Sequence, residues 1–243
     1  MWLLWLTTKR FDMKNVLIIS AHPEKASFCS SLKNTAREFF LAKGYEVKVS
    51  DLYAMNFDPV GDRSDFKSVT NPEFFKYQAE QLSSYRNDDF VDALKDEMEK
   101  LEWCDLLIFN FPLWWFGLPA ILKGWVDRVF AMGFAYGGGK GIYDKGVFKD
   151  KSVFITMTTG GPKHTYTDDG NNGDINMILF PIQHGIFYFT GMTVFQPFIS
   201  WGPARASEKE LKCEIERYKD YLNNFELQNP IYTNKKVEMK YYF

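Results

Sequence analysis

Cysteine is scarce in this sequence: the chain has three, Cys29, Cys104 and Cys213. They form no short motif and cannot all pair, which argues against a disulfide framework and a thiolate metal site. Unpaired cysteines favour a reducing compartment, so we expect a cytoplasmic protein. An excess of charge of one sign is lacking too, because the formal net charge is −2. This balance gives no support to binding of nucleic acid or of an anionic membrane.

Long apolar runs are also absent from the sequence. No stretch has the length of a transmembrane helix. The apolar residues 1–6 lack the basic leader of a signal peptide and are too few for its apolar core. Met13, directly before a strand-like run, is an equally good start of the chain. We therefore predict an N-terminal appendage at residues 1–12, one domain at residues 13–225 and a C-terminal tail at residues 226–243.

Aromatic residues, in contrast, are abundant. They make up 18% of the 243 residues, with 23 Phe, 13 Tyr and 7 Trp. Such an excess can fill a core, and it also suits a pocket that stacks planar ligands. The length suits one α/β domain, and a hydrophobic content of 46% is enough for its core.

Short apolar runs alternate along the chain with longer segments of helical spacing. The predicted strands are residues 16–21, 45–50, 105–109, 151–158 and 193–198. The predicted helices are residues 27–43, 88–101, 120–132, 174–189 and 207–225, the last with a capping box from Ser207 and Glu210. Residues 53–86 are rich in turn formers and long for a loop, so we expect that they hold short helical pieces or wrap over a ligand. The alternation predicts a flavodoxin-like, doubly wound α/β fold: a five-stranded parallel sheet of order 2-1-3-4-5 with helices on both faces.

The loop after the first strand leads into a helix that begins near Ser27. In doubly wound sheets, ligands bind beyond the carboxyl ends of the strands, where the strand order reverses. This loop has neither a Gly-x-Gly-x-x-Gly fingerprint nor a Walker A motif, which weakens a Rossmann nicotinamide site or a phosphate-transfer site. Free N–H groups at the start of the helix can still hold a pyrophosphate, with Ser27 supplying a hydroxyl. The alternative is that Ser27 only caps the helix and that His22 is a turn residue.

The loop after the third strand carries three consecutive aromatic residues, Trp114, Trp115 and Phe116, between Pro112 and Pro119. Consecutive residues point in different directions, so at least one of the three should face outward or into a cleft. The prolines imply a fixed loop, and a rigid apolar wall with exposed N–H groups suits a flat heteroaromatic ring. Plain core packing is the alternative.

The loop after the fourth strand contains Thr158, Thr159, Gly160 and Gly161, followed by Tyr166. The glycines permit a close approach of the backbone, and their N–H groups can point at the polar edge of a ligand. The side chain of Tyr166 offers an O–H donor nearby. Donors held in this way would stabilise the negative charge around N1 and O2 of a reduced flavin.

Together, these loops resemble the NAD(P)H:quinone oxidoreductases, the DT-diaphorase family of the flavodoxin-like superfamily. The resemblance runs from about Val16 to about Pro197. It includes residues 50–57, 115–130 (WFGLPAILKGWVDRVF), 134–136, 143–146, 158–161 and 181–183. The resemblance implies non-covalent FAD, NAD(P)H as co-substrate, and a homodimer with its active sites at the subunit interface. It also implies ping-pong, two-electron chemistry, in which a nicotinamide donor and then a quinone use the same face of the flavin.

The resemblance also assigns roles to individual residues. The implied FAD-binding residues are His22, Ser27, Phe28, Cys29, Pro112, Leu113, Trp114, Trp115, Phe116, Thr158, Thr159, Gly160, Gly161 and Tyr166. The implied catalytic residues are Tyr166, Gly160 and Asn172. The implied substrate residues are Trp115, Phe116, Tyr136 and Phe189, with the last two contributed by the partner subunit.

The chain departs from the family pattern at several of these positions. Cys29 replaces an Asn of many members, and Trp114 replaces the Gln of the NAD(P)H-using mammalian enzyme. Asn172 stands where that enzyme has its active-site His, and Asn cannot take up a proton near neutral pH. Asn at this place resembles the ribosyldihydronicotinamide:quinone reductases. Their metal-binding histidine pair is half present, as His184 and Tyr188, so we predict no metal.

The choice of donor follows from two of these features. Asn172 and an end at residue 243, without the C-terminal extension of the longer members, both favour weak binding of NADPH. Two alternatives stay open for the function. One is a flavin-binding ancillary subunit of a glutathione-gated potassium-efflux system, which resembles this family. The other is a one-electron carrier of the flavodoxin type, which would call for FMN and a strongly acidic face.

Overall fold

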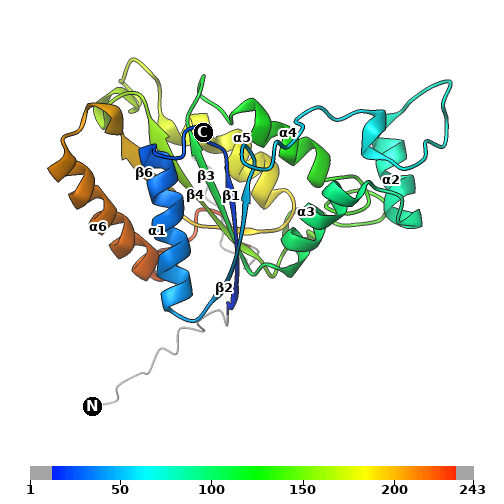
Figure 1. Ribbon diagram of the computed structural model, residues 1–243, viewed down its shortest axis with the longest axis horizontal. Coiled ribbons are helices and arrows are strands. Elements are labelled where there is room, and N and C mark those ends of the chain that lie inside the picture. Colours follow the sequence, from blue (N-terminus) through cyan, green and yellow to red (C-terminus); the bar gives the residue numbers. More distant parts are fainter. Residues whose placement is uncertain (1–12, 234–243) are drawn as a thin grey trace, which may run out of the picture.

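A parallel sheet forms the centre of the molecule, which the computed structural model describes over residues 13–233 (Figure 1). Its strands are β1 Asn15–Ser20, β2 Glu46–Asp51, β3 Leu106–Pro112, β4 Ser152–Thr159, β5 Thr193–Val194 and β6 Phe198–Trp201. The strand order is β2-β1-β3-β4-β5, and β6 also pairs with β4. The predicted α/β fold and strand order are thus confirmed. The predicted appendage at residues 1–12 and the end of the predicted tail at residues 234–243 lie outside the described residues.

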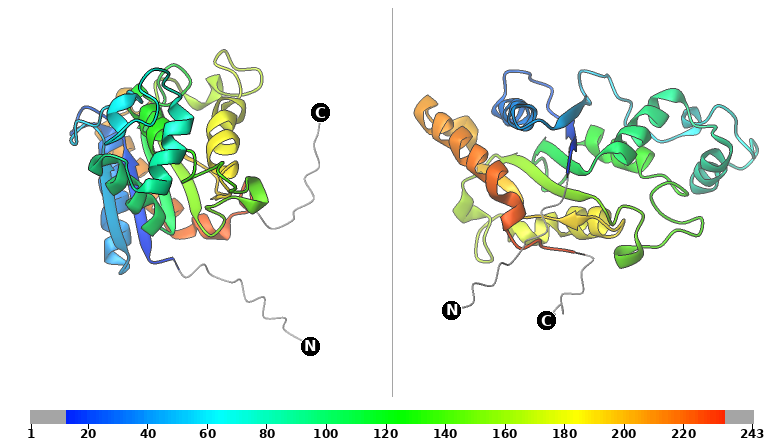
Figure 2. Two further views of the ribbon diagram at one scale, coloured as in Figure 1. Left: turned by 90° about the vertical axis from the view of Figure 1, so that its right-hand side faces the viewer. Right: turned by 90° about the horizontal axis from the view of Figure 1, so that it is seen from below.

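Helices cover both faces of the sheet. They are α1 Phe28–Ala42, α2 Tyr77–Asn87, α3 Asp92–Trp103, α4 Ala120–Val129, α5 Ile175–Ile182 and α6 Glu208–Asn224. Helices α1 and α6 pack together on one face, and α3, α4 and α5 lie on the other (Figures 1 and 2). The predicted capping box is present at the start of α6, where Ser207 and Glu210 each bond the backbone of the other.

The central strand β3 is buried at every position because helices cover both of its faces. Alternate side chains of a strand point to opposite faces. Leu107 and Phe109 therefore enter the apolar cluster under α3, α4 and α5. Leu106 and Ile108 enter the second cluster, under α1 and α6. One continuous apolar run thus builds two cores.

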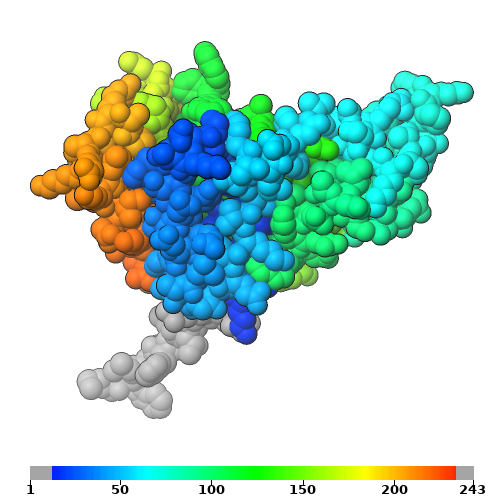
Figure 3. All heavy atoms as spheres, in the orientation of Figure 1, coloured from blue at the N-terminus to red at the C-terminus, as the bar shows by residue number. Residues whose placement is uncertain are grey.

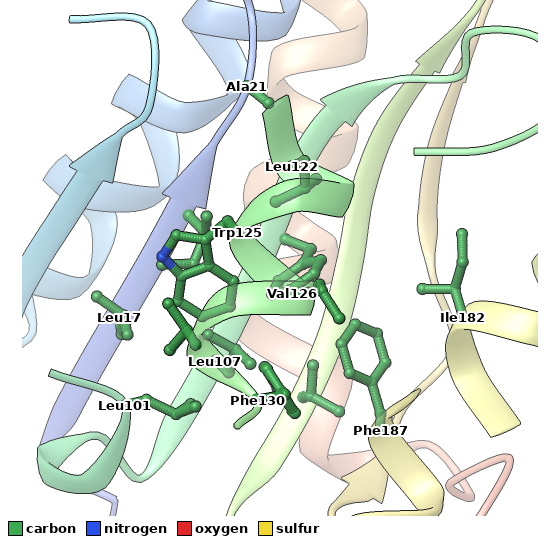
Figure 4. Close-up of a cluster of buried hydrophobic side chains, with 14 of the residues drawn as sticks. Leu17, Ala21, Leu101, Leu107, Leu122, Trp125, Val126, Phe130, Ile182 and Phe187 are labelled. Atoms are coloured by element: carbon green, nitrogen blue, oxygen red, sulfur yellow. The ribbon is translucent and has the colours of Figure 1, made fainter. Parts of the chain in front are cut away.

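Trp125 of α4 anchors the larger core and lies over the sheet near Leu107 (Figure 4). Its side chain is fully buried, and a buried indole needs a partner for its N–H group. That partner is the buried carboxylate of Glu97 on α3, at 2.8 Å from Nε1. The Oε1 atom of Glu97 also accepts from Ser50 and Lys100, so the buried charge is hydrogen-bonded on both oxygens.

The fifth strand is not the continuous segment 193–198 that the sequence predicts. It is divided into β5 and β6, and both parts pair with β4. Three residues, 195–197, separate the two parts, whereas Phe154 and Ile155 separate the matching positions of β4. One extra residue therefore forms a bulge, and it contains Pro197, which has no N–H group for a ladder. The prediction was also wrong at its end, because pairing continues to Trp201.

Residues 53–86 contain helical pieces, as expected: a short 3₁₀ turn at Arg63–Asp65 and the helix α2. This region projects from the body of the molecule (Figure 3). The predicted helix 88–101 begins later, at Asp92. Asp88 has a left-handed conformation that ends α2, and Phe90 pairs with Phe66 in an isolated bridge. These contacts hold residues 88–91 in a non-helical link that local spacing could not reveal.

The predicted helix 174–189 changes its winding midway. Regular α5 ends at Ile182 and continues as a π-helix over Gln183–Tyr188. Pro181 lies in the last turn of α5 and cannot donate a backbone hydrogen bond there. The first part of the predicted tail returns to the sheet, since Val194 and Tyr232 form an antiparallel bridge.

Candidate functional site

A cavity of about 550 Å³ opens at the carboxyl edge of the sheet, where four loops meet. Its lining residues are His22, Ser27, Phe28 and Cys29 after β1; Pro112, Leu113 and Trp114 at the end of β3; Thr158, Thr159 and Gly160 at the end of β4; and Pro203, Ala204, Ala206 and Leu211 from the β6–α6 region. Three of these groups come from the loops singled out in the sequence. The fold thus brings residues that are far apart in the chain to one ligand-sized space.

Ser27 is the N-cap of α1, and its Oγ accepts from the backbone N–H of Ser30 at 3.1 Å. Ser27 thus caps the helix and also lines the cavity, and its contact with a pyrophosphate stays a prediction. His22 is a turn residue whose Nδ1 accepts from the backbone N–H of Glu24 at 3.0 Å. The centre of its ring lies 6.3 Å from that of Trp114, which also lines the cavity.

Polar, uncharged side chains lie next to Cys29, which lines the cavity. The thiol of Cys29 lies 3.6 Å from Oδ1 of Asn110, which also accepts from the hydroxyl of Ser20 at 3.0 Å. Burial raises the pKa of Cys29 to about 12, against smaller opposing effects of a hydrogen bond with Thr158 and the charge of Lys33. The thiol is therefore neutral at physiological pH. The buried Nδ2 of Asn110 has no hydrogen-bond partner within residues 13–233.

Residues 114–117 form a tight turn with a backbone shape that is unusual for its residues. Trp115 and Phe116 have φ values of +48° and +59°, and the N–H of Gly117 donates to the carbonyl of Trp114 at 3.0 Å. Two successive positive φ values are typical of a type I′ turn, which normally carries Asn and Gly. Each such non-glycine residue costs about 1–3 kcal/mol. The turn presents its aromatic rings outward, and Trp115 is 97% exposed.

A second cavity of about 410 Å³ adjoins the first one and shares Leu113 and Gly160 with it. Its lining residues are Leu113, Trp115, Phe116, Gly160, Gly161, Tyr166 and Arg205. The ring of Tyr166 packs on that of Trp201, with the ring centres 5.4 Å apart. Aromatic rings from one loop and polar backbone from another thus face the same space.

Gly161 lies where a larger residue would not fit without movement. A Cβ atom there would approach Thr165 Oγ1 to 3.1 Å, Tyr166 Cε2 to 3.2 Å and Asn172 Nδ2 to 3.3 Å. Gly160, in contrast, has nothing within 4 Å of such an atom. Asn172 does not line either cavity, and its Nδ2 donates to Thr165 Oγ1 at 2.8 Å. It therefore supports the glycine loop from behind.

Tyr136 and Phe189 do not join the other predicted substrate residues. Their rings contact each other with centres 6.2 Å apart, and Tyr136 Oη accepts from Gln78 Nε2 at 2.9 Å. Neither residue lines the two cavities, whereas Trp115 and Phe116 line the second one. Within one chain, the predicted substrate slot is thus divided into two separate halves.

His184, half of the histidine pair considered above, packs among aromatic rings. Its ring stacks on Phe180 with centres 4.7 Å apart and lies 5.6 Å from the ring of Tyr188. Tyr143 and Tyr232 complete the cluster. No group of three or more His, Cys, Asp and Glu side chains that could hold a metal ion occurs within the described residues.

The β6–α6 region also contributes to the two cavities, and none of its residues was predicted from the sequence: Pro203, Ala204, Arg205, Ala206 and Leu211. The sequence could have indicated this contribution, because the carboxyl ends of all strands in a parallel sheet lie at the same edge. The predicted fifth strand ends at residue 198, whereas pairing continues to Trp201, so the loop that reaches the cavity begins later than predicted. None of the helices formed by residues 13–233 has the length and apolarity to cross a membrane.

Comparisons with known proteins agree on fold and family. Residues 14–222 match the model of a family described as having a flavodoxin-like fold. A ribosyldihydronicotinamide dehydrogenase (quinone) of Rattus norvegicus is 42% identical over 90% of this chain and 95% of its own length. An NAD(P)H dehydrogenase (quinone) 1 of Cavia porcellus is 43% identical over 90% of this chain and 80% of its own length. A solved structure from Klebsiella pneumoniae, assigned provisionally as a quinone reductase, has a TM-score of 0.86 and 36% identity, covering 90% and 87% of the two chains.

Proposed function

Since the chain belongs to the flavodoxin-like fold family that includes these quinone dehydrogenases, we propose that it catalyses the two-electron reduction of quinones with a nicotinamide donor. The observation that carries this proposal is the convergence of the three predicted loops on one cavity at the carboxyl edge of the sheet. The named relatives span nearly the whole of this chain. They are named for quinone reduction, so they do not support the alternative of a potassium-efflux ancillary subunit.

The cofactor that we propose is non-covalent FAD. The residues fit such a group: the N-terminus of α1 can hold a pyrophosphate, and the loop at Gly160 leaves room for a ring to approach its backbone. The two adjoining cavities together suit a dinucleotide. The neutral thiol of Cys29 adds no negative charge beside the phosphates. When bound, a flavin supplies hydride transfer from the nicotinamide donor to the quinone.

The protein's own residues would orient the reactants and stabilise charge. The turn at Trp115 and Phe116 would form one apolar wall for planar rings, and Tyr166 and the N–H groups of Gly160 and Gly161 would face a developing negative charge. Asn172 would act by holding this loop through Thr165 and would not take up a proton.

We further propose a homodimer, which would bring Tyr136 and Phe189 of the partner over the exposed turn of this chain. Their separation from Trp115 and Phe116 within one chain supports this arrangement. Among the described residues, Cys29, Cys104 and Cys213 are all free thiols, in keeping with the proposed cytoplasmic location.

A direct experiment tests the function. The protein is purified, its bound flavin is released and identified by chromatography, and oxidation of NADH, NADPH and ribosyl-dihydronicotinamide is followed with and without menadione. We expect released FAD and donor oxidation that depends on the quinone. A colourless protein that binds no added FAD would sink the proposal, and a stable blue semiquinone on partial reduction would favour the one-electron carrier instead.

A further inference from the structure

Arg205 introduces a positive charge at the cavity that contains Trp115 and Phe116. It lies in the short 3₁₀ turn Pro203–Arg205 between β6 and α6. Its Nη1 donates to the carbonyl of Gly160 at 2.6 Å, across two loops that are 45 residues apart. The other residues that line this cavity are aromatic, apolar or uncharged. Among the residues that line this cavity, the charged one is therefore Arg205.

The charge of Arg205 is not neutralised by a carboxylate that the structure describes. A neighbouring groove is lined by two acidic residues, Glu210 and Glu214, and both carboxylates have other partners. Glu210 accepts from Ser207 in the capping box, and Glu214 pairs with Arg217. No ion pair of Arg205 is found within residues 13–233. Its charge is thus available to a ligand.

The backbone on both sides holds Arg205 at the rim of the cavity. The N–H of Gly202 donates to the carbonyl of Thr159 at 3.1 Å, and Thr159 Oγ1 donates to the carbonyl of Gly161 at 2.8 Å. A guanidinium has five N–H donors in a fixed plane, and the bond to Gly160 uses one nitrogen. The remaining donors can bind a carboxylate or sulfonate oxygen, which suits the fork geometry of Arg.

We propose that Arg205 forms an anion subsite that selects quinones bearing a carboxylate or sulfonate at the edge of the ring. This inference rests on the proposed function and adds a substrate class to it. The ring of the quinone packs against the aromatic turn, and its anionic substituent reaches the guanidinium at the rim. The exposed position of Arg205 makes the effect moderate and sensitive to salt.

Steady-state kinetics with a matched pair of acceptors tests this subsite. The kcat/KM values of naphthoquinone and naphthoquinone sulfonate are measured for the wild type and for Arg205→Ala, Arg205→Lys and the control Lys209→Ala, which removes an exposed charge on α6. In a ping-pong mechanism, kcat/KM for the acceptor does not depend on the donor. The different redox potentials of the two acceptors cancel when their ratio is compared between variants.

We expect Arg205→Ala to lower the sulfonate-to-neutral ratio about threefold to fivefold at low salt, with the loss shrinking at about 0.5 M salt. Arg205→Lys should retain part of the preference, and Lys209→Ala should retain all of it. An unchanged ratio in Arg205→Ala, or an equal loss in Lys209→Ala, would overturn the subsite.

A binding measurement separates failure of the subsite from failure of the function. Naphthalene sulfonate and naphthol are titrated calorimetrically into the purified wild type and into Arg205→Ala. The subsite predicts tighter binding of the sulfonate to the wild type and loss of that preference in the variant, whether or not the protein turns over a quinone. If the wild type prefers the sulfonate but reduces no quinone, the proposed function is rejected and the anion subsite is kept. If both compounds bind equally to both proteins, the subsite is rejected.

Discussion

Gly161 shows how a single missing Cβ shapes the site. Because the atom would press on Thr165, Tyr166 and Asn172, we expect Gly161→Ala to displace Tyr166 and to lower stability by about 1 kcal/mol. Flavin affinity, measured by fluorescence titration, should fall as well. Gly185→Ala is the matched control, since nothing lies within 4 Å of its added Cβ. Equal flavin affinity of the two variants would contradict the role given to Gly161.

The three cysteines should differ in their reactivity toward an alkylating reagent. Burial raises the pKa values of Cys29 and Cys104 from 9.0 to about 12, whereas Cys213 is exposed. At pH 8, iodoacetamide should therefore label Cys213 rapidly and the other two only on unfolding, as peptide mass mapping would reveal. Rapid labelling of Cys29 in the folded protein would contradict its burial.

The same thiols affect stability. Cys29 and Cys104 stay protonated to a higher pH in the folded state than in the unfolded state. Their contribution to the free energy of unfolding is therefore complete below about pH 9 and is lost as the pH rises toward about 12. Chemical denaturation at several pH values should show the decline, and replacement of Cys104 by Ala should make the decline smaller.

The aromatic turn at residues 114–117 is the element in which local conformation conflicts most with residue type. Glycine adopts positive φ without steric cost, so Phe116→Gly should raise the free energy of unfolding by about 0.5 kcal/mol. The same change removes a wall of the proposed substrate slot, and kcat/KM for a quinone should fall at least tenfold. Asn56→Gly, at φ +49° outside the cavities, should change neither quantity much, because Asn tolerates this conformation. If Phe116→Gly lowers the free energy of unfolding and Asn56→Gly does not, the packing of the Phe116 ring stabilises the fold by more than the backbone strain costs.

Elements differ in how far the sequence determined them. The buried run of β3 and the caps Ser27 and Ser207 were predictable, because burial on both faces and N-capping leave local patterns. The link at residues 88–91 was not, since the bridge between Phe90 and the distant Phe66 holds it. The turn at Trp115 was not either, because its two positive φ values go against the preference of Trp and Phe. Arg205 was missed for a related reason: its approach to Gly160 depends on where β6 ends.

At the scale of the whole molecule, the divided substrate slot leads to a test of subunit cooperation. If each site combines Phe116 of one chain with Tyr136 of the other, homodimers of Phe116→Ala and of Tyr136→Ala are both impaired at both sites. A refolded equal mixture should then recover about a quarter of wild-type activity, because half of the dimers are mixed and each has one intact site. Separately refolded and then combined samples serve as the control. No recovery in a mixture that contains mixed dimers would show that both residues act within one chain.

The bulge between β5 and β6 also decides which side of the sheet each later residue serves. Side chains alternate strictly along a strand, so one inserted residue exchanges the two sets. With residues 195–197 in place, Phe198 packs on Tyr218 beneath α6, and Trp201 reaches Tyr166 on the opposite side. A strand shorter by one residue would turn Trp201 toward α6 and send the segment bearing Arg205 away from Gly160. The single inserted residue thus decides which side chains of this segment reach the mouth of the cavity.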